Sequence, residues 1–498
     1  MEIGFQEVTS KASEKVFGFP ATSKSLRPVH IAHGLFSYSL GYTKDNEKLR
    51  ELVDKPSDNP ASDLDESIKN RFNINNRTDD EKRLDQARLF MRKVLDNDDS
   101  VYSDKKFNAP TCSSDWFVNN AHISHTLSAE DYAPFLYRAV KKSEDLNKKL
   151  KSNLENRSDG ISLLFRPLLM DDEEERTDKD EWSSPELGET YKNGVGEVIE
   201  SGFDNLGSYI GDRSKDEKFL RDLRWLVRYS TFSMHLYMIN RNIEINEDID
   251  KSDKTPILLN YSNSEAVKEA SIETINKGLS QVEEATKKGV ESLLKQKGAK
   301  DFDKEEFLRL LNNQEILDLG NKSEKKKENI TESFKQLYKA HENKEDFQTL
   351  VDSVNDAIHF ESQFNTYTPR GTIGTFSWRI GLVKPRGNRS NKRYYEPDIE
   401  LLEAIVLSVL NPSDRMPIAK LCERLRKRYG IIVGGTTKDI EHLNEWGIQI
   451  GSTSSRKDPL KNQNFEAFKD ILVDLGYAKE YADGVTIVST NGGNLRNE

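Results

Sequence analysis

The chain has 498 residues, of which 35% are hydrophobic and 32% are charged, and its formal net charge is −11. This length predicts roughly three domains, and the acidic balance opposes indiscriminate binding of nucleic acid by the whole surface. No apolar run approaches the roughly 18 residues that a membrane-spanning helix needs, and residues 1–7 lack the pattern of a signal peptide. We therefore expect a cytoplasmic protein without membrane contact. The two cysteines, Cys112 and Cys422, form no disulfide framework, and a buried free thiol is expected for Cys422.

Residues 1–263 alternate short helical patterns with polar connections, which predicts an N-terminal α+β domain with acidic mobile loops. Loops are expected at residues 54–65 and in the acidic run 171–181. More ordered segments are expected at residues 85–95, 129–150 and 219–243, and the last, which is rich in apolar and aromatic side chains, is predicted to be the central helix of this region. Strand candidates are residues 161–169 and 257–261.

Residues 264–383 are predicted to be a helical region that ends in a strand. Helical character extends over residues 264–297, 302–319 and 330–360. Gly278 and Gly289 weaken a single long rod, so a bundle or a helical hairpin is expected. The strand is predicted where apolar residues alternate with small or polar ones, at Phe376, Trp378, Ile380 and Leu382. A basic linker over residues 384–394 then marks the next boundary.

Residues 395–490 contain a series of short helical patterns. The first is stopped by Asn411-Pro412, and the second follows Pro417 and ends before Gly430. A Thr436-x-x-Asp439 pattern then predicts a capped third helix. We expect its inward positions to be Ile440, Leu443 and Trp446 and its outward positions to be Lys438, Glu441, His442 and Glu445.

A further amphipathic helix is predicted over residues 465–475, with Glu466, Asp470 and Asp474 facing outward. Residues 477–489 then read as strand, Asp483-Gly484 turn and strand. This order of helices closed by a hairpin resembles the winged helix-turn-helix superfamily, over about residues 395–490 only. The expected fold class is therefore mainly α with some β (α+β), in a multidomain chain that has a C-terminal winged helix and a disordered tail at residues 491–498.

Positive charge is concentrated between residues 370 and 430, which hold thirteen Lys or Arg and six Asp or Glu. Winged helices commonly bind duplex DNA, and guanidinium groups bind phosphate bidentately. The predicted nucleic-acid contacts are Lys384, Arg386, Arg389, Lys392, Arg393, Arg424, Arg426, Lys427, Arg428 and Lys438. Alternatively, the basic stretch is a solvated linker that pairs with the acidic body of the same protein.

Motifs that would specify a reaction are missing from the sequence. The weak candidates for a metal site are the pairs His30-x-x-His33 and His122-x-x-His125, with Cys112 nearby, and no cofactor is expected. The chain has no Gly-x4-Gly-Lys-Ser/Thr loop, no Gly-x-Gly-x-x-Gly before a helix and no Gly-x-Ser-x-Gly. These absences disfavour a nucleotide-driven motor but leave room for an active site built from residues distant in sequence.

Large acidic proteins that end in a winged helix and lack their own motor or nuclease resemble accessory subunits of microbial DNA-handling or phage-defence complexes. This resemblance implies a non-catalytic adaptor that contacts DNA, with other protein subunits supplying the motor or nuclease activity. A scaffold that binds only proteins is the main alternative. An enzyme with an unrecognised N-terminal site is the second alternative.

Overall fold

The computed structural model describes residues 2–21, 82–87, 128–155, 173–175, 185–187, 194–210, 217–246, 254–360, 368–385, 392–450 and 458–490, with some positions between 31 and 44 and without 302, 314, 316 and 320–322. Of these residues, 69% are helical and 7% lie in strands, which confirms a mainly α fold with small sheets. None of the helices in these ranges combines the length and the apolarity that crossing a bilayer requires.

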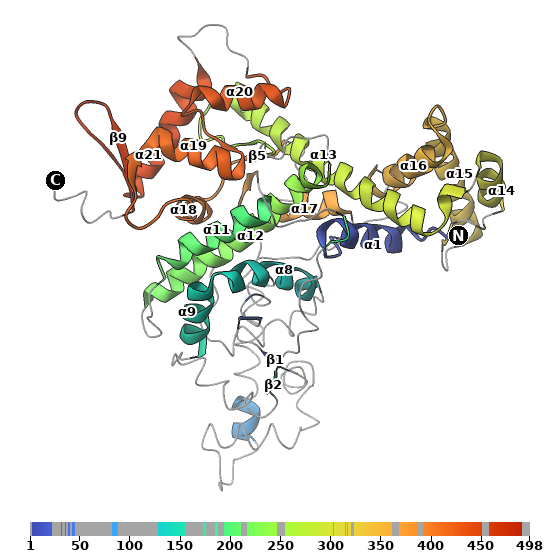
Figure 1. Cartoon of the computed structure of the whole chain (residues 1–498), viewed down its shortest axis with the longest axis horizontal. Coiled ribbons are helices and arrows are strands. Elements are labelled where there is room, and N and C mark those ends of the chain that lie inside the picture. The colour runs from blue at the N-terminus through green and yellow to red at the C-terminus, as the bar shows by residue number, and fades with distance from the viewer. Residues whose placement is uncertain are drawn as a thin grey trace.

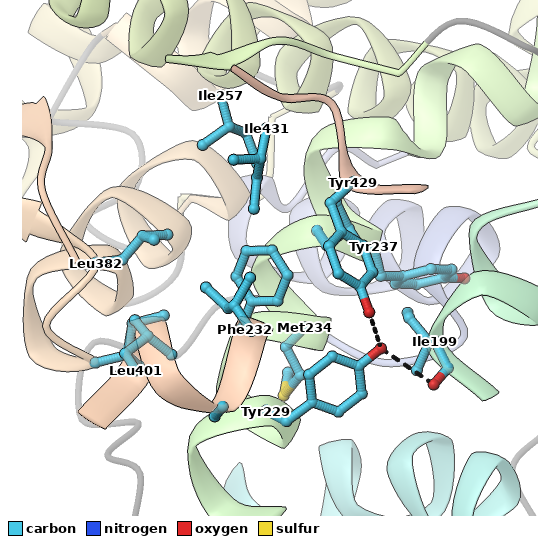
Figure 2. Close-up of a cluster of buried hydrophobic side chains, with 14 of the residues drawn as sticks. Ile199, Tyr229, Phe232, Met234, Tyr237, Ile257, Leu382, Leu401, Tyr429 and Ile431 are labelled. Carbon is cyan, nitrogen blue, oxygen red and sulfur yellow. Dashed lines mark hydrogen bonds between the residues drawn. The ribbon is translucent and has the colours of Figure 1, made fainter. Parts of the chain in front are cut away.

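The centre of the fold is α12 (Glu217–Ile245), which confirms the predicted central helix. Every residue from 225 to 244 is buried, so over this stretch the helix has no solvent face and must be enclosed by other elements. Tyr229 and Phe232 of α12 pack beside Tyr429 in the same core (Figure 2). The helices that contact α12 most are α11 (Val195–Gly207), α13 (Glu265–Gln296), α17 (Pro369–Arg379) and α18 (Ile399–Leu407).

The N-terminal elements pack on this centre. Helix α1 (Phe5–Phe17) lies along α13, and α8 (Ser128–Lys142) and α9 (Glu144–Glu155) pack on α11 (Figure 1). Strands β1 (Tyr42–Lys44) and β2 (Glu173–Glu175) pair antiparallel. Part of the acidic run that was predicted to be a loop is thus a strand.

A second core lies at the far end of α13, where α1 meets a group of shorter helices. It is built around Phe5, Phe307, Phe334 and Val354, and the rings of Phe5 and Phe334 are 5.6 Å apart. The shorter elements are the 3-10 turn η3 (Ala299–Asp301) and the helices α14 (Lys304–Asn312), α15 (Glu324–Ala340) and α16 (Asp346–Phe360).

Helix α13 is one continuous helix of 32 residues, although Gly278 and Gly289 were expected to weaken such a long rod. Of the two glycines, Gly289 marks a close contact with a neighbouring helix. A Cβ at Gly289 would lie 2.4 Å from the carbonyl oxygen of Ala12 in α1, whereas a Cβ at Gly278 would lie 3.4 Å from Ile239 of α12. Packing with α1 and α12 therefore outweighs the low helix propensity of glycine.

The predicted strand at residues 376–382 was also wrong, because this segment belongs to α17 and the turn that follows it. The side chain of Thr368 accepts a hydrogen bond from the amide of Gly371 (2.9 Å), and Pro369 occupies the first turn, so both residues favour a helix start. Both α12 and α13 cover α17, so more than one side of this helix is apolar. The apolar residues therefore recur at every second position, as they would in a strand. Extended backbone begins only at β4 (Val383–Lys384), which pairs with β5 (Tyr394–Tyr395).

The C-terminal segment confirms most of the predicted local elements. Helix α19 (Ile418–Tyr429) ends at Gly430, whose φ is +71°, and the capping box of Thr436 and Asp439 starts α20 (Thr437–Glu445). After the π-helical turn η5 (Leu460–Phe465) come α21 (Glu466–Asp474) and the predicted hairpin of β8 (Ala478–Glu480) and β9 (Thr486–Ser489). Strand β6 (Arg415–Pro417) completes a three-stranded sheet in the order β6-β9-β8.

The C-terminal segment shares its core with the rest of the protein. Strand β3 (Ile257–Leu258) pairs in parallel with β7 (Ile431–Ile432), and the amide of Asn260 donates to the carbonyl of Tyr395 (2.8 Å). One hydrophobic cluster extends from Val16 to Val488. Residues on both sides of the boundaries expected near 263, 383 and 394 contribute to this core. The proposed division into domains stays a prediction, and the tail at 491–498 lies outside the described residues.

The two glycines of α13 give a matched test of the packing. We expect Gly289→Ala to lower the free energy of unfolding by about 1–3 kcal/mol, because its methyl group overlaps the backbone of α1. Gly278→Ala should be neutral or stabilising by up to ~1 kcal/mol, since its methyl group makes ordinary contacts. Urea unfolding of both variants measures the difference, and equal midpoints would contradict the close contact of α1 with α13.

Candidate functional site

The first group of predicted nucleic-acid contacts surrounds the β4–β5 pair. Lys384 of β4 lies opposite Tyr394 of β5. Its side chain binds the carboxylate of Glu396, two residues after Tyr394. The guanidinium of Arg393 donates to the carbonyl of Gly374 in α17 (3.0 Å), and burial lowers the pKa of Arg393. Lys392 is exposed. Arg386 and Arg389 lie outside the described residues.

Two arginines of α19 bind the C-terminal end of α18. Arg424 donates to the carbonyl of Val409 (3.2 Å) and to the carboxylate of Asp414 (2.5 Å), and Arg428 donates to the carbonyl of Ser408 (3.3 Å). The carbonyls at the end of a helix lack partners within the helix and carry partial negative charge. These two predicted phosphate contacts therefore serve as caps for α18.

Arg426 faces a buried carboxylate of the same chain. Its Nε atom lies 3.5 Å from Asp439, the capping residue of α20, whose side chain is 1% exposed. Burial raises the pKa of Asp439, while hydrogen bonds from Thr436 and from the amide of Gly434 act in the opposite direction. Lys427 is exposed and pairs with Glu423 (2.6 Å). Lys438 is exposed on α20.

The orientation of α20 differs from the prediction at two positions. Ile440, expected to face inward, is 42% exposed, and His442, expected to face outward, is buried. The Nε2–H of His442 donates to the carbonyl of Lys254 (2.7 Å), just before β3. The buried face of α20 thus includes the polar residues Asp439 and His442, so the spacing of apolar residues alone could not predict which face is buried. Leu443 and half-buried Trp446 face the core as predicted.

Helix α21 and the hairpin carry an acidic exposed surface. Glu466, Asp470 and Asp474 follow one another at intervals of four residues, which places them in one row along the helix, and all three are exposed. Lys469 pairs with Glu466 (2.6 Å) and Glu480 (3.5 Å), so its charge is already matched. The exposed apolar side chains here are Val473 and Val485, and Asp483 lies at the hairpin turn. We name Glu466, Asp470, Val473 and Asp474 the α21 face.

A buried polar chain that the sequence did not reveal connects α12, α17 and β5. His235 bonds to Ser377 through Nδ1 (3.0 Å) and to the hydroxyl of Tyr395 through Nε2 (3.1 Å). Burial lowers the pKa of His235 to about 3, so the ring is neutral at physiological pH. A histidine within the helical pattern at residues 219–243 was the available signal, but its partners are more than 140 residues away.

The weak metal candidates His30, His33, His122 and His125, together with Cys112, lie outside the described residues. Within the described part of the chain, no group of three or more His, Cys, Asp or Glu side chains is arranged to hold a metal ion. Cys422 is a buried free thiol, as predicted, and burial raises its pKa.

Comparisons with protein-family models, curated proteins and solved structures gave no match to this chain.

The capping role of Arg424 can be separated from an electrostatic role in binding a ligand. We expect Arg424→Met to lower the free energy of unfolding by about 1–2 kcal/mol, because it leaves the carbonyl of Val409 and the carboxylate of Asp414 without this donor. The control Lys427→Met removes an exposed pair and should cost under about 0.5 kcal/mol. Urea unfolding provides the comparison. Equal stability of the two variants would exclude the capping role.

Proposed function

We propose that this protein is a scaffold subunit of a multiprotein complex and that its C-terminal segment binds a partner protein. The observation that carries this proposal is that arginines predicted to bind phosphate instead contact groups of their own chain. Arg424, Arg426 and Arg428 face backbone carbonyls or carboxylates of their own chain. Phosphate would have to displace these contacts before it could bind.

The order of the C-terminal elements supports a winged-helix fold for this segment. Helices α18 and α19 flank β6, α21 precedes the β8–β9 hairpin, and the three strands form one sheet. Strand β7 and α20 are additional elements between α19 and α21. Winged helices serve either DNA or proteins, so the charge on the exposed helix before the hairpin decides between the two uses.

That helix is α21, and its exposed row is acidic. Asp470 and Asp474 would repel phosphate in a DNA groove, whereas the α21 face offers carboxylates beside an exposed valine. Such a combination matches a partner surface that is basic with an apolar centre. The partner proposed here is therefore a protein with Lys or Arg around an apolar side chain.

A DNA-contacting adaptor is the second candidate. It is favoured by exposed Lys384, Lys392 and Lys438, although Lys384 also pairs with Glu396. Either candidate is compatible with an accessory subunit of a microbial DNA-handling or phage-defence complex in which other subunits supply the motor or nuclease.

The partner proposal predicts a loss of association when the α21 face is reversed in charge. We compare the tagged full chain with Asp470→Lys/Asp474→Lys, purified from native cells and analysed by mass spectrometry. The matched control is Glu328→Lys/Glu332→Lys, which reverses two exposed acids at the same spacing on α15. Partners should be lost from the α21 variant and retained by the control, because charge complementarity governs association. Partners retained by both variants would exclude this face.

Binding of duplex DNA across a salt series tests the second candidate. The intact chain should show no binding of a labelled duplex at physiological salt. Saturable binding that weakens steeply with salt would instead support the adaptor, because displaced counterions make phosphate contacts salt-dependent. The variant Arg386→Ser/Arg389→Ser/Lys392→Ser should then show a shallower slope. This result would replace the scaffold proposal by the DNA-contacting adaptor.

A further inference from the structure

His235 lies in the buried stretch of α12, beside a small cavity that α12, α13, α17 and the β4–β5 pair enclose. Its ring bonds to Ser377 of α17 and to Tyr395 of β5, so one side chain connects two elements to the central helix. Much of the cavity lining is aliphatic and consists of Ile239, Ile275, Leu279 and Val383. A change in the charge of the ring therefore acts on three elements at once.

Few charged groups face this ring. Within the described part of the chain the cavity lining contains no carboxylate, and its charged residue is Arg393, which donates to the carbonyl of Gly374 (3.0 Å). Burial raises the pKa of Tyr395, so the phenol keeps its proton. Arg228 and Arg241 lie about two turns away along α12, and each is paired with a carboxylate. A protonated ring would thus be a buried cation without an anionic partner in this lining, which is unfavourable.

The polar chain satisfies its hydrogen-bonding groups while the ring is neutral. In the tautomer that carries its hydrogen on Nδ1, the ring donates to Ser377 (3.0 Å), whose hydroxyl donates to the carbonyl of Ile373 (2.7 Å). The hydroxyl of Tyr395 then donates to Nε2 (3.1 Å). A proton on Nε2 turns this nitrogen into a donor, so the phenol hydrogen loses its acceptor. Among the described residues, this hydroxyl makes no hydrogen bond other than the one to His235, and a buried donor without an acceptor costs free energy.

We propose that the polar chain of His235, Ser377 and Tyr395 is an acid-sensitive junction, which holds α17 and β5 on α12 while the ring is neutral and releases them when the ring is protonated. Release exposes the ring to water, which hydrates the cation and supplies an acceptor for the phenol. Strands β4 and β5 pair over only two residues each, so few hydrogen bonds oppose a local separation. This junction is distant in function from the α21 face and does not depend on the proposed scaffold function.

The direction of the pH effect follows from the proton uptake of the two states. An exposed histidine has a pKa near 6.5, whereas burial lowers the pKa of His235 to about 3. Between these two values the opened state binds more protons than the closed state, so the closed state loses stability as the pH falls. The equilibrium constant for opening should therefore rise about 30-fold when the pH falls from about 7.5 to about 5.

The test is hydrogen exchange of the full chain at these two pH values, followed by mass spectrometry. Protection factors, which correct for the intrinsic pH dependence of exchange, should fall about 30-fold for the amides of α17 and β5. Helix α19 is the internal reference, because its residues lie outside the cavity lining, and it should lose less protection.

Two variants separate the charge of the ring from its hydrogen bonds. His235→Gln cannot take up a proton, but its amide can still bond to the hydroxyl of Tyr395, so the fall in protection should shrink from about 30-fold to under about threefold. The matched control Ser377→Ala deletes a hydrogen bond to the same ring. It should lower protection at both pH values and keep the fall of about 30-fold, because the ring can still be protonated.

Three results would overturn the proposal. Protection of α17 and β5 that is independent of pH in the unmodified chain would do so even if a variant failed to fold. An equal loss of protection in α19 would indicate unfolding of the whole chain and would exclude a local junction. A fall of the same size in His235→Gln, shown to be folded by circular dichroism, would assign the effect to another group, such as His359 of α16, whose pKa burial lowers to about 4.

Discussion

Enclosure of α12 is the constraint on which the rest of the structure depends. A helix buried from residue 225 to 244 gains stability only when other elements cover every face, and segments from both ends of the chain contribute to that cover. Its polar side chains are also removed from water, so each needs a partner at a fixed position. Arg228 binds Asp398 (3.2 Å) and the carbonyl of Ile380 (3.1 Å), which fixes α18 and the end of α17. Arg241 binds the carbonyl of Val16 (2.6 Å) and so fixes the end of α1.

The same principle explains why positive charge in the sequence was a poor guide to a binding surface. Helix α18 is largely apolar and packs on α12, so its C-terminal carbonyls require donors from α19. Arg428 shares the carbonyl of Ser408 with Asn205 of α11, and Arg424 binds the carbonyl of Val409 just beyond the helix, so these arginines of α19 have a structural role in the fold. A count of charges in a window cannot distinguish a cation that caps a helix from one that faces solvent.

Elements set by local chemistry were predictable from the sequence. The capping box at Thr436, the stop at Gly430 and the hairpin at Asp483-Gly484 each depend on a few neighbouring residues, and all three are present. Features set by distant contacts were not predictable. The apolar pattern near Trp378 indicated a strand because α17 is covered on two sides, and His442 faces inward because its acceptor is the carbonyl of Lys254. The polar chain of His235 likewise joins residues that only the tertiary structure brings together.

The hydrogen bond between the hydroxyls of Tyr229 and Tyr429 joins residues 200 positions apart (Figure 2). At a synthesis rate of roughly 5–20 residues per second, a ribosome needs about 10–40 s to add the intervening chain. During this interval α11 and α13 can already pack on α12, but the surface of α12 that α18 and Tyr429 cover has no partner. The parallel pair β3–β7 must also wait for Ile432. The central core is thus completed only after most of the sequence has emerged, and the uncovered side of α12 is a natural target for chaperones that bind during translation.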